Sequence, residues 1–265
     1  MADLSGKVAL VTGAGHLKGI GYGIASQLIK AGATVIISDI AESLAVQNGV
    51  ADLQRLGGTA AFVACDVTNK ESFKEALAFV LKHYKKLDIL VNNAGVAIGS
   101  ENFLMIEDSD WQLSWQVNLM GVVNGCQTVL PVFKQQSSGT IINIASLAGL
   151  GAIEGIPANY TATKFALIGL TKQLALQYAS DNIRINAICP GSVVTQMHDL
   201  TLQSIAQNNG VSLEKAQEIE SASIPLGYSA KPQAVGDAAV FLASKSASYI
   251  TGQALPVAGG MAPGL

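Results

Sequence analysis

Short apolar runs alternate along the chain with longer stretches in which apolar residues recur every three or four positions. The short runs lie at 7–11, 34–38, 60–64, 88–91, 140–144, 183–188 and 254–257. The stretches with helical spacing lie at about 20–32, 41–56, 70–84, 109–135 and 157–178. Continuous apolar runs predict strands buried on both faces, and strands alternating with helices predict a parallel sheet between two helical layers. We therefore expect one α/β domain over residues 1–265, a doubly wound parallel sheet of about seven strands.

The segment between Pro190-Gly191 and Lys231-Pro232 is longer than a simple connection between a strand and a helix needs to be. It holds two further helical patterns, near 198–207 and 212–222. Long insertions of this kind are typical of segments that close over an active site. We expect residues 192–228 to form a helical lid over the substrate.

Composition and charge exclude several classes of partner. The chain is 49% hydrophobic and 13% charged, with a net charge of −3, which gives no reason to expect nucleic acid or an anionic membrane as a partner. No apolar run is long enough for a membrane span, and the first residues lack a basic segment followed by an apolar one. These features predict a cytoplasmic protein.

The three cysteines do not suggest a disulfide framework or a metal site. Cys65, Cys126 and Cys189 are far apart, and each lies in apolar sequence. We expect buried, reduced thiols, and we expect no metal site because no His, Cys and acidic residues have ligand spacing.

A glycine-rich turn follows the first expected strand. Thr12-Gly13-Ala14-Gly15 is followed by Gly19-Ile20-Gly21 and then by a helical pattern. Glycines let a backbone approach a ligand closely, and the N-terminus of a helix offers unpaired N–H groups to an anion. Strand, turn and helix in this order predict a phosphate cradle in a Rossmann-type fold.

Asp39 ends the second expected strand, eighteen residues after Gly21. A carboxylate at this position accepts hydrogen bonds from a ribose diol and repels a 2′-phosphate. The unit therefore predicts a dinucleotide site that prefers NAD to NADP.

Tyr160 and Lys164 are four residues apart in an expected helix, so their side chains share one face. An ammonium about 5 Å from the phenol, at an effective dielectric of about 20, would favour phenolate by roughly 3 kcal/mol, or about two pKa units. The pair therefore predicts a tyrosine whose pKa is lowered far enough for a general base.

Together these motifs resemble the short-chain dehydrogenase/reductase family, in its compact one-domain form, over essentially the whole chain. The matching positions are the glycine turn, Asn92-Asn93-Ala94-Gly95, Asn118, Ser146, the Tyr160–Lys164 pair and Pro190-Gly191. The resemblance implies an NAD(P)-dependent enzyme acting on CH–OH groups. In it Tyr160 exchanges the substrate proton, Ser146 binds the substrate oxygen, Lys164 assists both the tyrosine and the cofactor ribose, and Asn118 anchors a water beside Lys164.

The resemblance also assigns the cofactor site. We expect the dinucleotide to contact Gly13, Gly15, Lys18, Gly19, Ile20, Gly21, Asp39, Asp66, Val67, Asn93, Ala94, Gly95, Tyr160, Lys164, Pro190, Gly191, Val193 and Thr195.

The glycine turn departs from the family pattern. Five residues, 14–18, separate Gly13 from the Gly19-Ile20-Gly21 motif, where the family usually has three. Lys18 also lies where relatives that prefer NADP often carry a basic residue. Because Asp39 both binds the ribose diol and excludes the extra phosphate, we expect NAD, with NADP less favoured.

Two residues near the expected active site suggest the class of substrate. Glu154, six residues before Tyr160, and His198, at the start of the lid, are candidate contacts for substrate hydroxyls, beside Ser146 and Tyr160. With the long lid they favour a sugar alcohol, another polyol, a diol or the corresponding ketose.

Other functions remain open. The C-terminal half resembles reductases of 3-oxoacyl thioesters almost as well, although these usually prefer NADP. An enoyl-thioester reductase is less compatible, because that branch places its Tyr and Lys seven residues apart and Leu167 stands there. A dinucleotide-binding module without catalysis is the alternative from another class, but such proteins usually lack a Tyr, Lys or Ser that is present here.

The low charge density and the family resemblance together predict a homotetramer. The helices at 109–135 and 157–178 are expected to pack across one interface, and the nearly uncharged stretch 257–265 to be buried against a neighbour.

Overall fold

The computed structural model describes residues 3–262, so the last three residues of the apolar C-terminal stretch lie outside the described residues. The strands are β1 (Val8–Thr12), β2 (Thr34–Asp39), β3 (Ala60–Ala64), β4 (Ile89–Asn92), β5 (Gly139–Ile144), β6 (Ile183–Pro190) and β7 (Ala254–Val257). The α-helices are α1 (Ile20–Lys30), α2 (Leu44–Arg55), α3 (Lys70–Tyr84), α4 (Asp108–Trp115), α5 (Gly121–Gln136), α6 (Ala158–Tyr178), α7 (Gln196–Asn209), α8 (Leu213–Ser223) and α9 (Pro232–Ala243).

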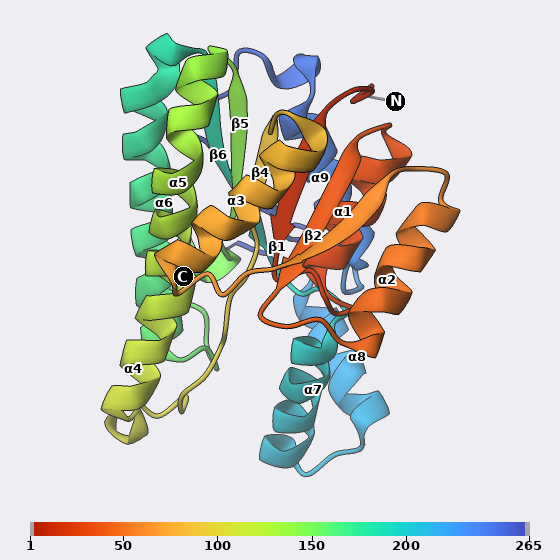
Figure 1. Ribbon diagram of the computed structural model, residues 1–265. Helices are drawn as coiled ribbons and strands as arrows, with labels where there is room; N and C mark the ends of the chain where they lie inside the picture. The colour runs from red at the N-terminus through yellow and green to blue at the C-terminus, as the bar shows by residue number, and fades with distance from the viewer. Residues whose placement is uncertain (1–2, 263–265) are drawn as a thin grey trace.

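The seven strands form one parallel sheet with the order β3-β2-β1-β4-β5-β6-β7. Figure 1 labels its central strands β2, β1, β4, β5 and β6. This confirms the expected doubly wound α/β fold. The chain leaves β1 for β2 and β3 on one side and returns to place β4 on the other side of β1. In such sheets, ligands bind beyond the carboxyl ends of the strands at this reversal. The fold therefore places the glycine turn after β1 at the centre of the expected site.

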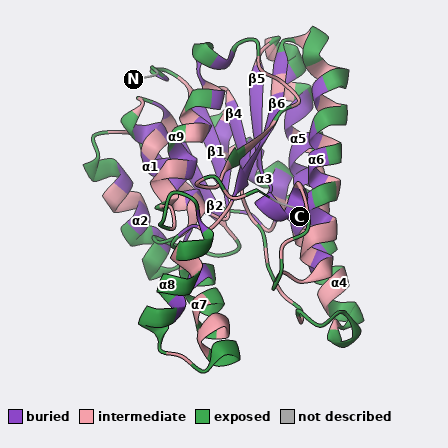
Figure 2. Cartoon of the chain, turned by 180° about the vertical axis from the view of Figure 1, so that it is seen from behind, coloured by how far each residue is buried: buried purple, intermediate pink, exposed green. Residues whose placement is uncertain are grey.

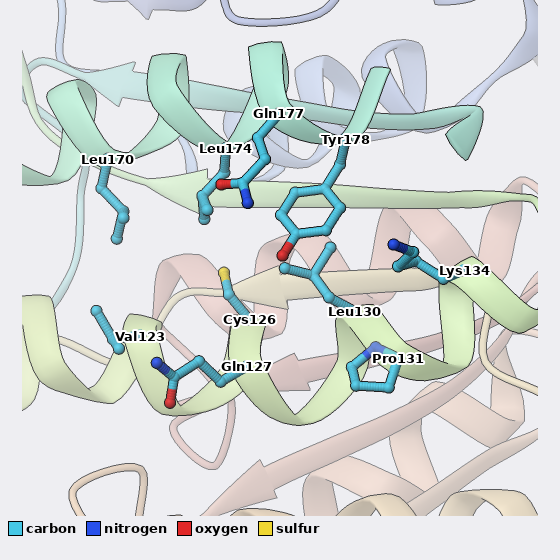
Figure 3. A pocket seen from close by; sticks show the side chains of 10 residues that line it. All are labelled: Val123, Cys126, Gln127, Leu130, Pro131, Lys134, Leu170, Leu174, Gln177 and Tyr178. Atoms are coloured by element: carbon cyan, nitrogen blue, oxygen red, sulfur yellow. The ribbon is translucent and has the colours of Figure 1, made fainter. Parts of the chain in front are cut away.

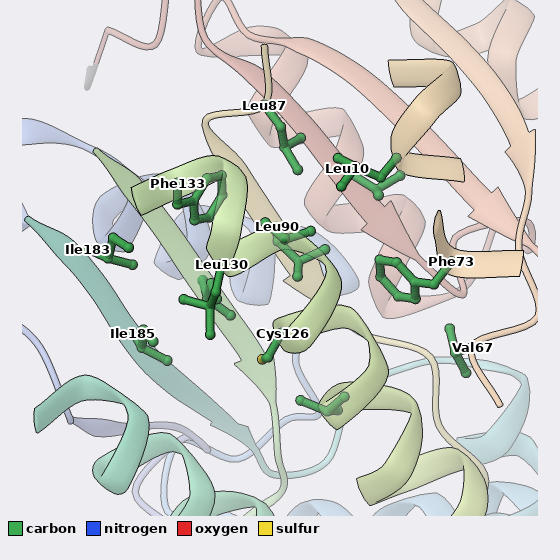
Figure 4. Close-up of a cluster of buried hydrophobic side chains, with 14 of the residues drawn as sticks. Leu10, Val67, Phe73, Leu87, Leu90, Cys126, Leu130, Phe133, Ile183 and Ile185 are labelled. Atoms are coloured by element: carbon green, nitrogen blue, oxygen red, sulfur yellow. The ribbon is translucent and has the colours of Figure 1, made fainter. Parts of the chain in front are cut away.

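Two apolar cores lie on opposite faces of the sheet, and successive residues of a strand alternate between them. From β1, Leu10 enters the core formed with Phe73 of α3 and Phe133 of α5, shown in Figure 4. Val11 enters the other core, against Ile24 of α1 and helix α9. Figure 2 shows the resulting arrangement, with buried strands between helices whose outer faces are exposed. Both faces of the sheet are covered, which explains why the strands are apolar without alternation.

The stretch 109–135, expected as one helix, is interrupted. Helices α4 and α5 are joined by a turn of π-helix, η2 (Gln116–Met120), which contains Asn118. One extra residue in a helical turn leaves the apolar spacing almost unchanged, so the periodicity did not reveal it. Such turns occur often at functional positions in helices. Here the π-helical turn lies at a residue expected in the active site.

The two helices expected in the segment 192–228 are present as α7 and α8, which pack against each other beyond the carboxyl edge of the sheet (Figure 1). Short 3-10 helices had no periodic signal and were not expected; they are η1 (Phe103–Met105), η3 (Leu147–Gly149), η4 (Ala179–Asp181) and η5 (Lys245–Ala247). No helix among residues 3–262 is long and apolar enough to cross a membrane.

Candidate active site

The glycine turn after β1 is closely packed against the segment that follows β4. Gly13 has φ +62°, and a Cβ there would lie 2.6 Å from the Cα of Ala94. A Cβ at Gly21 would lie 2.5 Å from Nδ2 of Asn93 and 2.7 Å from the backbone oxygen of Gly13. Both glycines are therefore required by the close approach of two backbones, and Gly13 also by its left-handed conformation.

Asn93 holds this turn in place. Its Nδ2 donates hydrogen bonds to the carbonyl oxygens of Thr12 and Gly13, both at 2.8 Å. The N–H groups of Asn93 and Ala94 donate to Oγ1 of Thr12 at 3.1 and 3.2 Å. The Asn93 side chain is thus occupied by the protein itself, and its contribution to a cofactor site is to shape the turn.

The first turn of α1 has the features of an anion site. Gly19 is the N-cap and provides no side-chain bond to the helix N–H groups, and no acidic residue lies in the first turn. In the lengthened turn, the N–H of Gly19 donates to the carbonyl of His16, and Lys18 is exposed beside it. The N–H groups of a helix start, with their partial positive charge, suit the pyrophosphate of a dinucleotide.

Asp39 lies where the ribose of a dinucleotide is expected. Its Oδ2 accepts a hydrogen bond from the N–H of Gly15 at 3.0 Å, and its Oδ1 accepts one from the N–H of Ile40 at 2.9 Å. A Cβ at Gly15 would lie 2.7 Å from Oδ2, so glycine is needed there as well. The carboxylate is fixed at the end of β2 and retains acceptor capacity for a diol.

Asp66 and Val67 follow β3, as expected, but their side chains have structural contacts. Oδ1 of Asp66 accepts bonds from the N–H and the hydroxyl of Thr68, at 2.9 and 2.7 Å. Val67 is buried in the core, where its side chain closely approaches Gly121. A cofactor contact at Val67 would therefore use its backbone.

Tyr160 and Lys164 lie on one face of α6, as their spacing predicted. Nζ of Lys164 is 5.4 Å from the centroid of the Tyr160 ring. The same Nζ donates a hydrogen bond of 2.9 Å to the carbonyl of Ile144, at the end of β5. This bond fixes the ammonium at the carboxyl edge of the sheet.

The predicted lowering of the tyrosine pKa is wrong for the chain by itself. Burial raises the pKa of the Tyr160 phenol, and the hydrogen bond with Ser146 opposes this only in part. Burial also lowers the pKa of Lys164 from 10.5 to about 8. The spacing of the two residues reveals the attraction between their side chains, but not the free-energy cost of removing both side chains from water.

Ser146 and Asn118 complete the group. Ser146 follows β5, and its Oγ accepts a hydrogen bond from the N–H of Ala148 while lying within hydrogen-bond reach of Tyr160. Asn118 is buried, and its amide bonds to both the N–H and the carbonyl of Val96, at 2.8 and 2.9 Å. The side chains expected to act together are therefore brought to one edge of the sheet.

Gly95 leaves room between two of these side chains. A Cβ at Gly95 would lie 3.3 Å from Oδ1 of Asn118 and 3.6 Å from Nζ of Lys164. Glycine at residue 95 therefore avoids a tight contact with the amide of Asn118.

The end of β6 and the segment after it contain four further residues expected at the cofactor. The N–H of Gly191, which follows Pro190, donates to the carbonyl of Val257 at 3.0 Å. Val193 is buried and forms an isolated parallel bridge with Ala230. Thr195 is the N-cap of α7, and its Oγ1 accepts from the N–H of His198 at 3.2 Å. The Thr195 side chain thus has a capping role that the sequence analysis did not identify.

The two expected substrate contacts differ in their surroundings. Glu154 is exposed in the loop that precedes α6, as a free carboxylate would be. His198 is buried, and its Nε2 is bonded to Oε2 of Glu220 at 2.6 Å. Because that nitrogen is already paired, His198 is not placed as the open contact for a substrate hydroxyl that its position in the sequence suggested. Glu220, 22 residues away, carried no local signal.

The cysteines and the potential metal ligands are further candidates for a site of their own. Cys65, Cys126 and Cys189 are buried free thiols, as expected. Within residues 3–262 no three His, Cys, Asp or Glu side chains gather as a metal site requires.

Comparisons with known proteins agree with this geometry. The family model described as enoyl-(acyl carrier protein) reductase matches residues 13–262. A 3-oxoacyl-[acyl-carrier-protein] reductase, FabG, of Thermotoga maritima is 36% identical over 97% of this chain and 98% of its own length. The chain belongs to the short-chain dehydrogenase/reductase family. It is therefore an oxidoreductase of the family that the sequence motifs suggested.

Two solved structures of the family are similar along almost the whole chain. An actinorhodin polyketide ketoreductase with NADPH has a TM-score of 0.91 and 33% identity, covering 98% of this chain and 99% of the other. An NAD⁺-bound xylitol dehydrogenase has a TM-score of 0.88 and 28% identity, covering 97% of this chain and 99% of the other. The fold thus accommodates either dinucleotide, and the cofactor of this chain must be argued from its own residues.

Proposed function

We propose that the protein transfers a hydride between a secondary alcohol and NAD, or from NADH to the corresponding ketone. The observation that carries this proposal is the Asp39 carboxylate, which is held by Gly15 and Ile40 at the end of β2. At this position a fixed negative charge favours a ribose diol and repels the 2′-phosphate of NADP. Lys18 is exposed on the lengthened turn and is free to meet the pyrophosphate or solvent instead.

When bound, the dinucleotide supplies the hydride acceptor or donor, and the protein supplies position and proton transfer. As the phenolate, Tyr160 takes the alcohol proton in oxidation, and as the phenol it gives that proton to the carbonyl oxygen in reduction. The raised pKa of Tyr160 keeps the phenol protonated at neutral pH, so the proton needed in reduction is present, whereas formation of the phenolate needed in oxidation requires alkaline conditions or added positive charge. Ser146 positions the substrate oxygen beside this hydroxyl.

Lys164 and Asn118 support the proton transfer. The Lys164 ammonium, anchored on the carbonyl of Ile144, stabilises negative charge on the phenol oxygen. Asn118, fixed on Val96, lies close to Gly95, which is also close to the ammonium of Lys164. A water bound at Asn118 would connect Lys164 to the surrounding solvent.

The proposed substrate is a polyol, a sugar alcohol or a diol. Glu154 supports this class, because an exposed carboxylate in the loop before Tyr160 can accept hydrogen bonds from a second hydroxyl. The similarity to xylitol dehydrogenase is consistent with it. The second candidate is reduction of 3-oxoacyl thioesters, which the similarity to the Thermotoga maritima reductase favours.

Substitution of Asp39 tests the choice of cofactor. Asp39→Ala removes the charge and the diol contact, so we expect kcat/KM for NAD to fall by about tenfold or more and that for NADP to rise. Glu42 is an exposed acid three residues further on, so Glu42→Ala is the matched control. It should leave the ratio of kcat/KM for NAD to kcat/KM for NADP unchanged. An unchanged preference in Asp39→Ala would remove the argument for NAD.

We also propose that residues 1–265 form one domain and assemble as a homotetramer. Strands from both ends of the described chain join one sheet. Between α5 and α6, Leu130, Leu170 and Leu174 line a shallow groove of about 440 Å³ (Figure 3). Leu176, on the same helix α6, is 78% exposed. An apolar groove and an exposed leucine on α6 suit contact with a second copy of this chain.

The assembly is tested by measuring mass in solution. Light scattering should give about four times the 27.4 kDa of one chain. Leu176→Asp should reduce this mass, whereas Leu200→Asp, which places the same charge on the exposed side of α7, should not. A mass of one chain at every protein concentration would contradict the proposal.

A further inference from the structure

A buried polar cluster connects α7 and α8 to the strand ends of the sheet. His198 of α7 and Glu220 of α8 form its centre, with 2.6 Å between Nε2 and Oε2. Their side chains are only 7% and 10% exposed. Ser192 donates a hydrogen bond of 2.8 Å to Oε1 of Glu220, and Ser229 donates one of 3.1 Å to Oε2. The Glu220 carboxylate is thus bound by three residues from three different segments.

The charge in this cluster is stabilised by its partners. Burial by itself would raise the pKa of the Glu220 carboxyl, but the hydrogen bonds from His198, Ser192 and Ser229 leave it below its ordinary value. A buried carboxylate that lost these partners would have to be hydrated or protonated. The cluster therefore favours one position of α8 relative to α7 and to the segment after β6.

The arrangement is not that of a hydrolytic triad. Both Glu220 and Ser229 approach the same ring nitrogen of His198, at 2.6 and 3.4 Å. Within the described residues, Nδ1 is buried without a hydrogen-bond partner. A triad needs the acid on one nitrogen and the nucleophile on the other, so His198 cannot act as the base for Ser229 while Glu220 orients it.

The cluster reaches the candidate active site through the backbone of Ser192. This residue follows Gly191, and its carbonyl accepts a hydrogen bond from the N–H of Ala230 at 3.0 Å. The N–H of Val194 in turn donates to the carbonyl of Ala230 at 2.8 Å. The segment 191–195, which the proposed function places at the cofactor, is therefore held by backbone bonds on one side and by Glu220 on the other.

We propose that His198 and Glu220 are positioning residues for the hydride-transfer reaction, holding α7 and α8 against the segment 191–195 without touching the substrate. This inference rests on the proposed function, because the position of the two helices affects turnover only if dinucleotide and substrate bind beside them. It assigns His198 a role different from the substrate contact expected from the sequence. A pair buried this deeply between two helices acts as a unit, so loss of either member has the effect of losing both.

The variants Glu220→Ala and His198→Ala remove one member each, and Glu220→Gln keeps the size and the hydrogen-bonding capacity without the charge. We expect KM for the substrate to rise by about ten- to a hundredfold in either alanine variant, with a smaller loss of kcat. The double variant should be no worse than either single one, and Glu220→Gln should recover a large part of the loss. Glu218→Ala removes an exposed carboxylate from the same helix, where it pairs with Lys215, and is the matched control.

Hydrogen exchange separates this inference from the proposed function. Amides of 196–223 should exchange faster in Glu220→Ala than in the wild type or Glu218→Ala, while amides of the sheet should not. If the wild type binds neither NADH nor NADPH, the proposed function fails, and the exchange data still report on the cluster. The positioning role is refuted by a different result. In that case the wild type turns over substrate, while Glu220→Ala has a substrate KM within about twofold of the wild-type value and the same amide exchange rates.

Discussion

Replacing Lys164 by methionine should abolish turnover and yet relieve a cost to stability that depends on pH. In the folded protein, burial lowers the pKa of Lys164 from 10.5 to about 8. Its pKa in the folded state is therefore below that in the unfolded chain, and the unfolded chain binds this proton more tightly. The difference between these two pKa values of Lys164 corresponds to about 3 kcal/mol of free energy, which destabilises the folded wild type at neutral pH.

The direction of the Lys164 pKa shift determines the pH range in which stability changes. Below about pH 8 both states carry the proton, and the full cost is present. As the pH rises from about 8 to 10.5, the folded state has already lost the proton while the unfolded state still holds it, so the wild type gains stability relative to the variant. In the variant the carbonyl of Ile144 lacks its hydrogen-bond donor at every pH. This shifts the difference in free energy of unfolding between the two proteins by about 1 kcal/mol but does not change how that difference depends on pH.

Urea unfolding at fixed protein concentration, repeated between about pH 7 and pH 10, measures this difference directly. Above pH 8, the free energy of unfolding of the wild type should rise relative to that of Lys164→Met by about 1 kcal/mol for each pH unit. Lys172→Met, on the exposed side of α6, is the matched control and should give curves parallel to the wild type. Parallel curves for Lys164→Met as well would refute the claim that a buried ammonium destabilises the fold.

Three further substitutions test the site and the core. Tyr160→Phe should fold normally and reduce kcat by about a hundred- to ten-thousandfold, since it removes only the proton carrier; normal turnover in a steady-state assay would remove Tyr160 from the mechanism. Gly21→Ala places a Cβ 2.5 Å from Nδ2 of Asn93, so fluorescence titration should show NADH binding weakened by about tenfold or more, and an unchanged Kd would contradict the described packing. Phe133→Ala empties a fully buried position and should cost about 3–5 kcal/mol in urea unfolding, whereas a loss below about 1 kcal/mol would show that the core repacks.

Local patterns were sufficient for the sheet, because each strand is a continuous apolar run whose burial needs no distant partner to be recognised. The glycine turn and Asp39 were also found from local spacing, and the structure explains them by contacts of Gly13, Gly15 and Gly21. The π-helical turn at Asn118 was missed, since it changes the phase of a helix without breaking its apolar spacing.

What the sequence could not give was the partner of each buried polar group. Glu220 binds His198 and Ser192 across distances of 22 and 28 residues, and nothing near Glu220 in the sequence marks it. The pKa of Tyr160 failed for a related reason, because the burial of both side chains depends on β5 and β6 as much as on α6. The spacing of Tyr160 and Lys164 can be read from the sequence, but the solvent exposure that determines the direction of the pKa shift cannot.

We propose that this chain oxidises a polyol or diol with NAD. The most direct test follows NADH or NADPH absorbance with purified protein, both cofactors in parallel, and a panel of hexitols, pentitols, vicinal diols and simple secondary alcohols. We expect rapid formation of NADH with at least one polyol or diol and little or no reaction with NADP. Turnover with NADP alone, or only in the reduction of 3-oxoacyl thioesters, would contradict it.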